Sequence, residues 1–352
     1  MTLAEAVAVS ADPARARHFH DAFQTAGVDG PWLVAEGEPA RVLAAVWSGS
    51  QVLGDWLVQH PDWLPMLLDI EGLQSPRTVR ALQTELGAWL PAALRSGDFT
   101  GALARVRELQ RRELLRIAAR DLARLGRTAE IMLELSDLAD TCLQAVFRVV
   151  WAQLTARFGA PWEQTIEGGW QPSRSCVLGM GKLGGQELNY SSDVDVLFVY
   201  SDEGWVFKDA PRKGSTAGKG LTNHEFFRRF GEAFIAEVGR STAEGMLYRI
   251  DLRLRPEGKA GPLARSLESY ENYYAQWGQT WERLMLIKTR VVAGDAALAD
   301  EFLEMVQPFR FPRLIGSGVM EEIAAMKRRL ETEIVRASDE DRNVKLWFPL
   351  PG

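Results

Sequence analysis

The sequence predicts an α+β protein that is mostly helical, with a small mixed-sheet core between an N-terminal and a C-terminal helical region. Apolar residues recur every three or four positions through most of the first half of the chain, which is typical of amphipathic helices. From about Gly159 onward, glycine and proline become frequent and runs such as DVDVLFVY alternate with period two, which is typical of strands. After about Arg265 the helical spacing returns. We therefore expect helices over residues 1–168, a mixed-sheet core over 169–263 and helices over 264–352.

The composition is that of an ordinary globular protein. The 352 residues are 46% hydrophobic and 25% charged, and the net charge of -6 disfavours a broad surface for nucleic acid. Two cysteines, Cys142 and Cys176, do not make a disulfide framework, and we expect both to be buried packing residues. The start of the chain lacks the apolar core of a signal peptide, and no apolar run reaches the length of a membrane span. We therefore expect a cytoplasmic protein that binds neither nucleic acid nor a membrane.

The helical pattern is strongest over residues 98–158. Arginines are interleaved there with apolar residues at helical spacing: Leu115, Ala118, Leu122 and Leu125. We interpret these arginines as a solvated helix face, since charged rows on a helix usually face water. Asp137 is expected to cap a following helix, because aspartate accepts hydrogen bonds from the free N–H groups at helix starts.

The core region opens with the glycine loop GMGKLG, Gly179–Gly184, which matches the pattern G-x-G-x-x-G. In dinucleotide-binding proteins this pattern leads from a strand into a crossover helix. Only the stretch 185–192 separates the loop from the next strand-like run, which leaves too little room for such a crossover. A Walker-type loop is also excluded, because Leu183 follows Gly181-Lys182 where that loop requires Ser or Thr. The glycines therefore serve another purpose beside a strand.

Acidic side chains mark the start of the run DVDVLFVY. Because side chains alternate along a strand, Asp193 and Asp195 share one face. The opposite face points into a core and carries Val194, Val196, Phe198 and Tyr200. A second strand-like run, YRIDLRLR, places four charged side chains on one face: Arg249, Asp251, Arg253 and Arg255. If the two strands are neighbours, three carboxylates converge among arginines.

Such a cluster suits magnesium, which prefers carboxylate oxygens and completes its shell with water and phosphate oxygens. Two magnesium ions would stabilise both the attacking and the leaving oxygen in phosphoryl chemistry. The residues expected to contact nucleotide phosphates offer backbone N–H groups or cationic side chains: Gly179, Gly181, Lys182, Ser191, Ser192, Arg253 and Arg255. Three other interpretations stay open. The aspartates could be a strand-edge pair that opposes aggregation, the arginines structural partners of those acids, and Lys182 a solvated side chain.

The stretch 201–221 separates the two strand-like runs; it lacks periodicity and is predicted to be a loop. A helix is expected after it, because Thr222 with Glu225 fits a capping box. One stripe of this helix is apolar and should be buried: Phe226, Phe230, Phe234 and Val238.

Several stretches resemble the glutamine synthetase adenylyltransferase/adenylyl-removing family, which lies within the DNA polymerase beta-like nucleotidyltransferase superfamily. In the core and after it these stretches are GMGKLGGQELNYSSDVDVLFVY, YRIDLRLRPEGKAGPL and YYAQWGQTWERLMLIKTRVVAGD. RRELLRIAARDL and LSDLADTCLQA resemble the helical region before that family's catalytic core. The resemblance implies a polymerase beta-like nucleotidyltransferase core in which Asp193, Asp195 and Asp251 are the catalytic metal ligands.

Members of this family usually carry two such units. The N-terminal unit removes AMP from a tyrosine of glutamine synthetase by phosphorolysis, which gives ADP, and the C-terminal unit adds AMP from ATP. The N-Y-S-S-D wording resembles the removing unit, so the resemblance implies magnesium-dependent deadenylylation in the regulation of nitrogen assimilation. The implied partners are glutamine synthetase, ATP or ADP, inorganic phosphate and a nitrogen-signalling PII protein. ATP-dependent adenylylation of glutamine synthetase is the alternative direction.

The end of the chain departs from the family's pattern. An N-x-K-L stretch is normally followed by a G-x-G-G-I-R-D/E-I-E-F helix, whereas Val344-Lys345-Leu346 runs here into WFPLPG. We therefore expect the region 264–352 to be truncated. This expectation keeps a third hypothesis open, a catalytically weak fragment that only binds glutamine synthetase or a nitrogen-signalling partner. The three aspartates favour an enzyme, since a binding module does not need converging acids.

Overall fold

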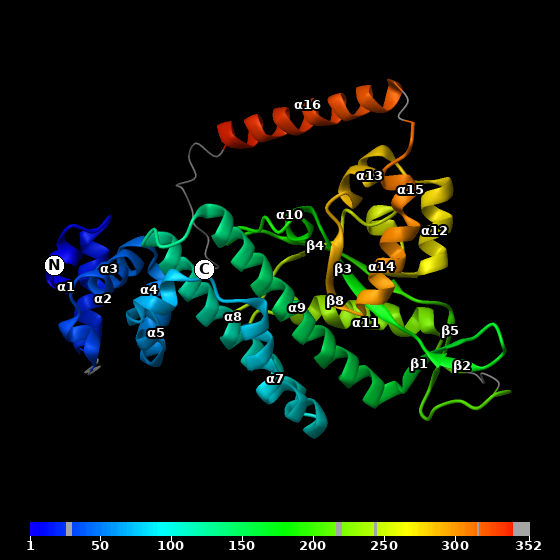
Figure 1. The fold of residues 1–352 in the computed structure, drawn as a ribbon, viewed down its shortest axis with the longest axis horizontal. Coiled ribbons are helices and arrows are strands. Elements are labelled where there is room, and N and C mark those ends of the chain that lie inside the picture. The colour runs from blue at the N-terminus through cyan, green and yellow to red at the C-terminus, as the bar shows by residue number, and fades with distance from the viewer. Residues whose placement is uncertain (26–29, 216–219, 243–244, 315–316, 341–352) are drawn as a thin grey trace.

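The computed structural model describes residues 1–352 except 26–29, 216–219, 243–244, 315–316 and 341–352. Figure 1 shows the N-terminal helices at one end of the molecule, a small sheet toward the other end, and the long helix α9 running between them. Helices α12 to α15 cover the far side of the sheet. The fold is therefore α+β and mostly helical, as the sequence predicts.

The N-terminal region is built from helices joined by short turns. In order along the chain they are α1 (Leu3–Ala8), α2 (Pro13–Thr25), α3 (Glu38–Gly49), α4 (Gln51–Gln59), α5 (Leu64–Leu68), α6 (Ile70–Gln74), α7 (Val79–Ser96), α8 (Phe99–Leu122) and α9 (Thr128–Phe158). Ser50, Thr78 and Asp98 begin α4, α7 and α8, each accepting a hydrogen bond from an N–H of the first turn. These side chains satisfy donors that a helix leaves free at its start.

The interpretation of Asp137 as a helix cap is wrong. Asp137 lies inside α9, which runs without a break from Thr128 to Phe158. Its Oδ1 accepts a hydrogen bond from Gln186 Nε2 at 3.2 Å. The Asp137 carboxylate therefore contacts a distant segment of the chain instead of capping a helix.

The prediction that the arginines of α8 form a solvated face is wrong for part of the helix: Arg105 is exposed, but others are buried. Arg116 and Arg120 are 7% and 0% exposed, and both donate to the Glu134 carboxylate of α9, at 2.6 and 2.8 Å. The acids that neutralise the arginines come from several elements, so the pattern of α8 alone could not reveal their burial. We call the connected set the buried ion cluster: Arg77, Glu85, Arg112, Glu113, Arg116, Arg120 and Glu134.

The main sheet joins strands from distant parts of the sequence. Its strands are β3 (Ser175–Met180), β4 (Val194–Tyr200), β6 (Ile250–Asp251), β7 (Ala264–Ser266) and β8 (Arg290–Gly294). β3 lies between β4 and β8 and is antiparallel to both, whereas β6 and β7 pair in parallel with the other edge of β4. The sheet is therefore mixed, as predicted. The sequence placed β7 and β8 in the helical region 264–352, because short strands beside helices carry little periodic signal.

Both faces of the main sheet are buried. Val196 and Phe198 pack into a core shared with α9 and α11 (Asn223–Val238), as the alternation predicts. Leu197 and Val199, on the other face, pack into a second core shared with the C-terminal helices. The face that carries Asp195 is therefore polar only at the start of β4. Both cysteines are free and buried, as predicted.

A second, three-stranded sheet lies beside the main sheet. Its antiparallel strands are β1 (Ala160–Gln164), β2 (Trp170–Pro172) and β5 (Gly204–Phe207), with β1 in the middle. β5 falls in the stretch 201–221, so the prediction of a loop is wrong over Gly204–Phe207. Residues 216–219 of that stretch lie outside the described residues.

Helix α11 begins and packs as predicted. The Thr222 side chain accepts from the Glu225 N–H at 3.1 Å, whereas the Glu225 carboxylate pairs with Arg228 and Arg229 rather than completing a capping box. The four residues of the apolar stripe are each no more than 1% exposed: Phe226, Phe230, Phe234 and Val238.

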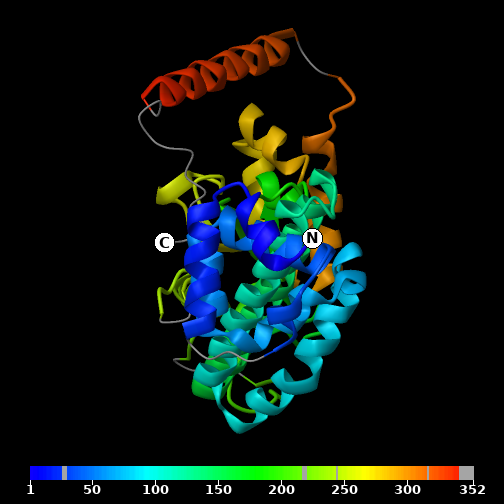
Figure 2. The same ribbon diagram turned by 90° about the vertical axis from the view of Figure 1, so that its left-hand side faces the viewer.

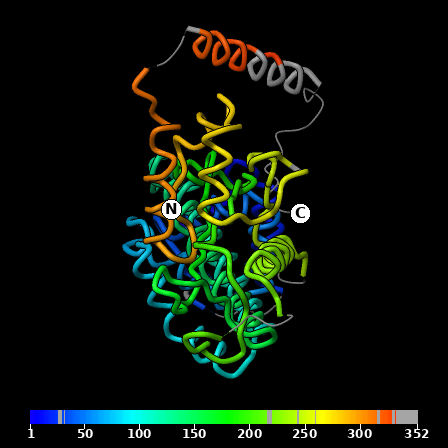
Figure 3. The backbone as a smooth tube through the Cα atoms, turned by 90° about the vertical axis from the view of Figure 1, so that its right-hand side faces the viewer, coloured from blue at the N-terminus to red at the C-terminus, as the bar shows by residue number. Residues whose placement is uncertain are grey.

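The C-terminal helices are α12 (Leu267–Gln276), α13 (Thr280–Leu286), α14 (Ala296–Met305), α15 (Gln307–Arg310) and α16 (Ser317–Glu340). Helix α16 lies apart from the sheet in every view (Figure 1, Figure 2 and Figure 3) and touches α13, where Thr280 Oγ1 hydrogen bonds to Glu322. No helix in the described part of the chain is long and apolar enough to span a membrane. The expected truncation at Val344 lies outside the described residues.

Candidate active site

The glycine loop is a tight turn rather than the start of a long helix. β3 ends at Met180 and the chain enters α10 (Gly181–Gly184), after which β4 returns antiparallel to β3. Gly181 has a φ of +54°, in the left-handed region that favours glycine. A Cβ atom at Gly181 would lie 2.6 Å from Asp195 Oδ2. The missing side chain therefore lets the loop approach the carboxylate closely.

Asp195 lies between the glycine loop and the third aspartate. At the start of β4 it pairs with Met180 of β3 on one side and with Asp251 of β6 on the other. The sequence could place these two acids together only if the strands were neighbours, and the parallel β4–β6 pair meets that condition.

The two carboxylates differ in their electrostatic surroundings. Burial, followed by the charges of Asp251 and Asp193, raises the pKa of Asp195 to about 6. Hydrogen bonds from the Arg253 side chain, the largest cause, hold the pKa of Asp251 below its ordinary value. Asp195 makes no ion pair with any described residue, so it carries the unbalanced charge of the site.

Asp193 precedes β4 and is partly exposed. Its Oδ1 accepts from Arg249 Nε, and the two side chains are 40% and 65% exposed. The sequence places Arg249 on the same face as Asp251, but Arg249 is not among the predicted site residues. The sequence feature that points to Arg249 is the strand face that it shares with Asp251.

The expected strand YRIDLRLR is shorter than predicted, so Arg253 and Arg255 do not lie on a strand face. β6 ends at Asp251, because the Asp251 carboxylate accepts the Arg253 backbone N–H at 2.8 Å and forms a turn. The Arg253 side chain folds back on Asp251, with Nε 2.7 Å from Oδ2. The Arg255 side chain donates to the Gly261 carbonyl at 3.4 Å.

The remaining candidate residues lie around the loop and the turn before β4. Lys182 is exposed, and its charge opposes the rise in the pKa of Asp195. Ser192 Oγ donates to Asn189 Oδ1 at 2.7 Å within the turn, and Ser191 is exposed. Their contacts with phosphate remain predictions.

The donor set fits magnesium, although it is not arranged as a closed cage. Among the described residues, no three His, Cys, Asp or Glu side chains are positioned to hold an ion together. Asp193 and Asp251 face Arg249 and Arg253, so binding by all three aspartates requires those arginines to move. Carboxylate oxygens beside a backbone loop are nevertheless the ligands that magnesium prefers.

Gly181→Ala is expected to perturb both stability and the site. The left-handed conformation costs a non-glycine residue about 1–2 kcal/mol, and the new methyl group would press on Asp195. We expect weaker binding of Mg·ADP and a lower urea midpoint. Gly87→Ala in α7 is the matched control, because a Cβ there meets nothing within 4 Å. It should raise stability by about 1 kcal/mol, and an equal loss in both variants would contradict the argument.

The site combines a glycine turn, an acidic strand start and a third acid on the neighbouring strand, which is the arrangement expected of a nucleotidyltransferase. A profile of the family described as glutamate-ammonia ligase adenylyltransferase matches residues 40–305. The chain belongs to this family.

Curated relatives agree with this assignment. Each of the following is named bifunctional glutamine synthetase adenylyltransferase/adenylyl-removing enzyme. The protein of Thioalkalivibrio sulfidiphilus is 39% identical over 87% of this chain and 30% of its own length. The Nitrosococcus oceani protein is 33% identical over 93% and 32%, and the Pseudomonas aeruginosa protein 34% over 90% and 30%. The chain thus spans about 30% of the length of the relatives it matches.

Proposed function

We propose that this chain is a magnesium-dependent nucleotidyltransferase unit that removes AMP from the adenylylated tyrosine of glutamine synthetase by phosphorolysis, giving ADP. The observation that carries the proposal is the register of Asp195 between the glycine loop and Asp251. The names of the relatives support glutamine synthetase as the protein substrate. The likeness of the N-Y-S-S-D stretch to the removing unit supports the direction.

In the proposed reaction an oxygen of inorganic phosphate attacks the phosphorus of the adenylyl-tyrosine diester in line with the tyrosyl oxygen. The new P–O bond makes ADP, the bond to the tyrosyl oxygen breaks, and the tyrosyl oxygen takes up, through solvent, the proton that the attacking hydrogen phosphate releases. No protein nucleophile is required, because phosphate supplies the attacking oxygen. Asp193, Asp195 and Asp251 would hold two magnesium ions, which would neutralise charge on the transferred group.

The chain's own cations bind and orient the phosphates in this proposal. N–H groups of the glycine loop and the Lys182 side chain would bind phosphate oxygens. The Arg253 side chain is 75% exposed, whereas that of Asp251 is 13% exposed, so Arg253 would exchange Asp251 for a phosphate when a magnesium ion takes over the Asp251 carboxylate. Arg253 can thus be both the structural partner of Asp251 and a phosphate ligand.

The proposal extends to the cellular setting. We place the chain in the cytoplasm, with ATP or ADP, inorganic phosphate and a nitrogen-signalling PII protein among its partners. The free, buried cysteines agree with a reducing compartment.

ADP formation tests the proposed reaction. Adenylylated glutamine synthetase, magnesium and inorganic phosphate are mixed with the wild-type chain or with the Asp193→Ala/Asp195→Ala variant, and ADP is measured. We expect ADP from the wild type alone. Transfer of AMP from ATP to unmodified glutamine synthetase would establish the adenylylating direction instead. If neither ADP nor adenylylated glutamine synthetase forms, the remaining hypothesis is a fragment that only binds glutamine synthetase or a nitrogen-signalling partner.

A further inference from the structure

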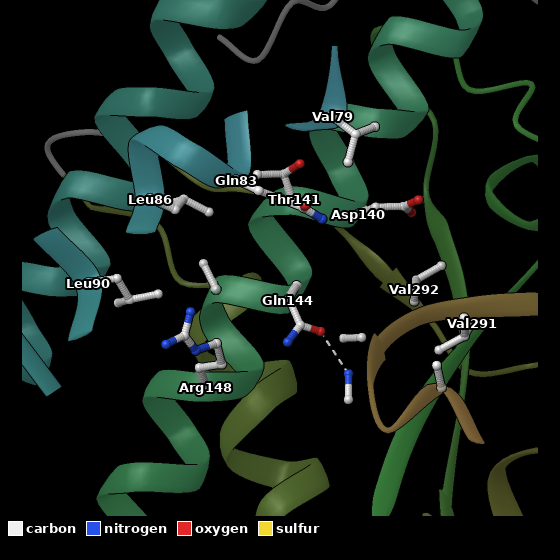
Figure 4. Close-up of a pocket in the computed structure, with 14 residues that line it drawn as sticks. Val79, Gln83, Leu86, Leu90, Asp140, Thr141, Gln144, Arg148, Val291 and Val292 are labelled. Atoms are coloured by element: carbon white, nitrogen blue, oxygen red, sulfur yellow. Dashed lines mark hydrogen bonds between the residues drawn. The ribbon is translucent and has the colours of Figure 1, made fainter. Parts of the chain in front are cut away.

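Helix α9 presents a row of polar side chains to the main sheet. Ser136, Asp137, Asp140 and Gln144 share one helix face, because neighbours at spacings of three and four lie together. Figure 4 shows Asp140 and Gln144 directed toward β8 beside a cavity of about 450 Å3 between α7, α9 and β8. Gln144 Oε1 accepts the backbone N–H of Gly294, at the end of β8, at 2.7 Å. This face of α9, which includes Asp140 of the LSDLAD stretch, therefore contacts β8 through polar side chains.

The same row also holds the segment that follows the glycine loop. Ser136 Oγ accepts the backbone N–H of Leu188 at 3.3 Å, and Asp137 accepts from Gln186 at 3.2 Å. α9 thus contacts both the segment leading to the aspartates and the strand β8 that flanks β3.

Arg290 connects this row to the glycine loop itself. It begins β8 opposite Gly179, and both of its terminal nitrogens bond to the Asp140 carboxylate, with Nη2 3.0 Å from Oδ1. The same Nη2 donates to the Leu183 carbonyl at 2.9 Å. Both side chains of the pair are largely buried, at 24% exposed for Arg290 and 20% for Asp140. One guanidinium therefore joins α9, β8 and the glycine loop.

The glycine loop has little room to move against the β8 side of the sheet. A Cβ at Gly184 would lie 2.1 Å from the Lys288 carbonyl oxygen, and one at Gly179 would lie 2.6 Å from Val292 Cγ1. Because Gly184 meets the Lys288 backbone and Gly179 meets the Val292 side chain this closely, we expect a shift of Arg290 to move the loop as well. A displacement of about 1 Å in such a site can cost on the order of 100-fold in rate.

We infer that Asp140 and Arg290 form a positioning pair. The pair fixes the Leu183 carbonyl and thereby holds the glycine loop where its N–H groups can bind nucleotide phosphates. This inference rests on the proposed function, in which the loop binds phosphate. Neither residue touches the reacting atoms; Asp140 acts by orienting Arg290, and Arg290 by holding the loop.

A purely structural pair would have a different signature. Loss of a buried ion pair lowers stability whether or not it positions a loop. A positioning pair also changes the affinity for nucleotide in protein that is still folded, and its two members act as one unit, so that their effects do not add. It should raise the KM for phosphate while leaving the KM for the protein substrate unchanged.

Equilibrium binding of Mg·ADP tests the inference on the full chain. The variants are Arg290→Lys, which keeps the charge but loses the two-pronged contact, the nearly isosteric Asp140→Asn, and their combination. Arg174→Lys is the matched control, because Arg174 makes a similar two-pronged pair with Glu301 beyond the other end of β3. Melting temperatures identify the variants that are folded, and phosphorolysis gives KM and kcat.

We expect about a tenfold higher Kd for Mg·ADP in each single variant, no further increase in the combination, and no change in Arg174→Lys. Folded variants that bind Mg·ADP like the wild type would overturn the positioning role, as would effects that add. If the wild type binds Mg·ADP but does not deadenylylate glutamine synthetase, only the proposed reaction is refuted. The Kd values of the variants would still decide whether the pair positions the loop. A wild type that binds no nucleotide would overturn both.

Discussion

Asp195→Asn is expected to reduce ADP formation by about 10²–10⁴-fold while leaving the fold intact. Asp195 lies between the glycine loop and Asp251 and makes no ion pair with any described residue, so its charge remains available to a cation. Metal ligation contributes several kcal/mol to stabilising the transition state, and each factor of ten in rate corresponds to about 1.4 kcal/mol. Asparagine keeps the shape of the side chain and removes that charge.

Two measurements check the result. The rate of ADP formation is compared with that of Asp300→Asn, an exposed acid of α14 that serves as the control and should match the wild type. The melting temperature is followed as magnesium is added, since a ligand that binds only the folded state stabilises it. The wild type should be stabilised and Asp195→Asn should not. Without metal the variant should be at least as stable as the wild type, because repulsion from Asp193 and Asp251 is relieved. An active Asp195→Asn would refute the metal-ligand role.

Glu134→Gln is expected to destabilise the protein by about 3–5 kcal/mol, through the buried ion cluster rather than through the active site. Glu134 is 3% exposed and accepts from Arg116, from Arg120 and from the backbone N–H of Arg77. Glutamine keeps one acceptor oxygen but removes the charge that balances two buried guanidinium groups. Urea unfolding of the purified chain measures the loss.

The control for this variant is Glu301→Gln. Glu301 also pairs with an arginine, but its side chain is 44% exposed, and exposed pairs contribute about 0–1 kcal/mol. Equal effects of Glu134→Gln and Glu301→Gln would show that burial of the cluster does not determine its contribution.

The sequence predicted those features of the site that depend on local geometry. Period two places Asp193 and Asp195 on one face of a strand, and the tight glycine loop follows from the short spacing between β3 and β4. Whether these two aspartates lie beside Asp251 depends on which strands pair, and the alternation of side chains does not determine that. The parallel register of β4 and β6 supplied that condition.

Features that depend on distant partners were not predictable. The turn at Asp251 follows from a carboxylate that captures the Arg253 N–H, and this bond competes with continuation of the strand. The burial of Arg116 and Arg120 depends on Glu134 in another helix. Charged residues usually face water, so only the tertiary arrangement could reverse that expectation.

The contact between Arg290 and the glycine loop has a consequence for how the protein is made. Arg290 lies 107 residues after Leu183 and 150 after Asp140, so the loop leaves the ribosome well before the strand that holds it. At about 5–20 residues per second, roughly 5–20 s separate the two events. During that interval β3 has no neighbour on its β8 side, and an unpaired strand edge is a template for pairing with other chains. Late arrival of β8 thus makes the nascent chain vulnerable to aggregation at the strand that leads into its own active site.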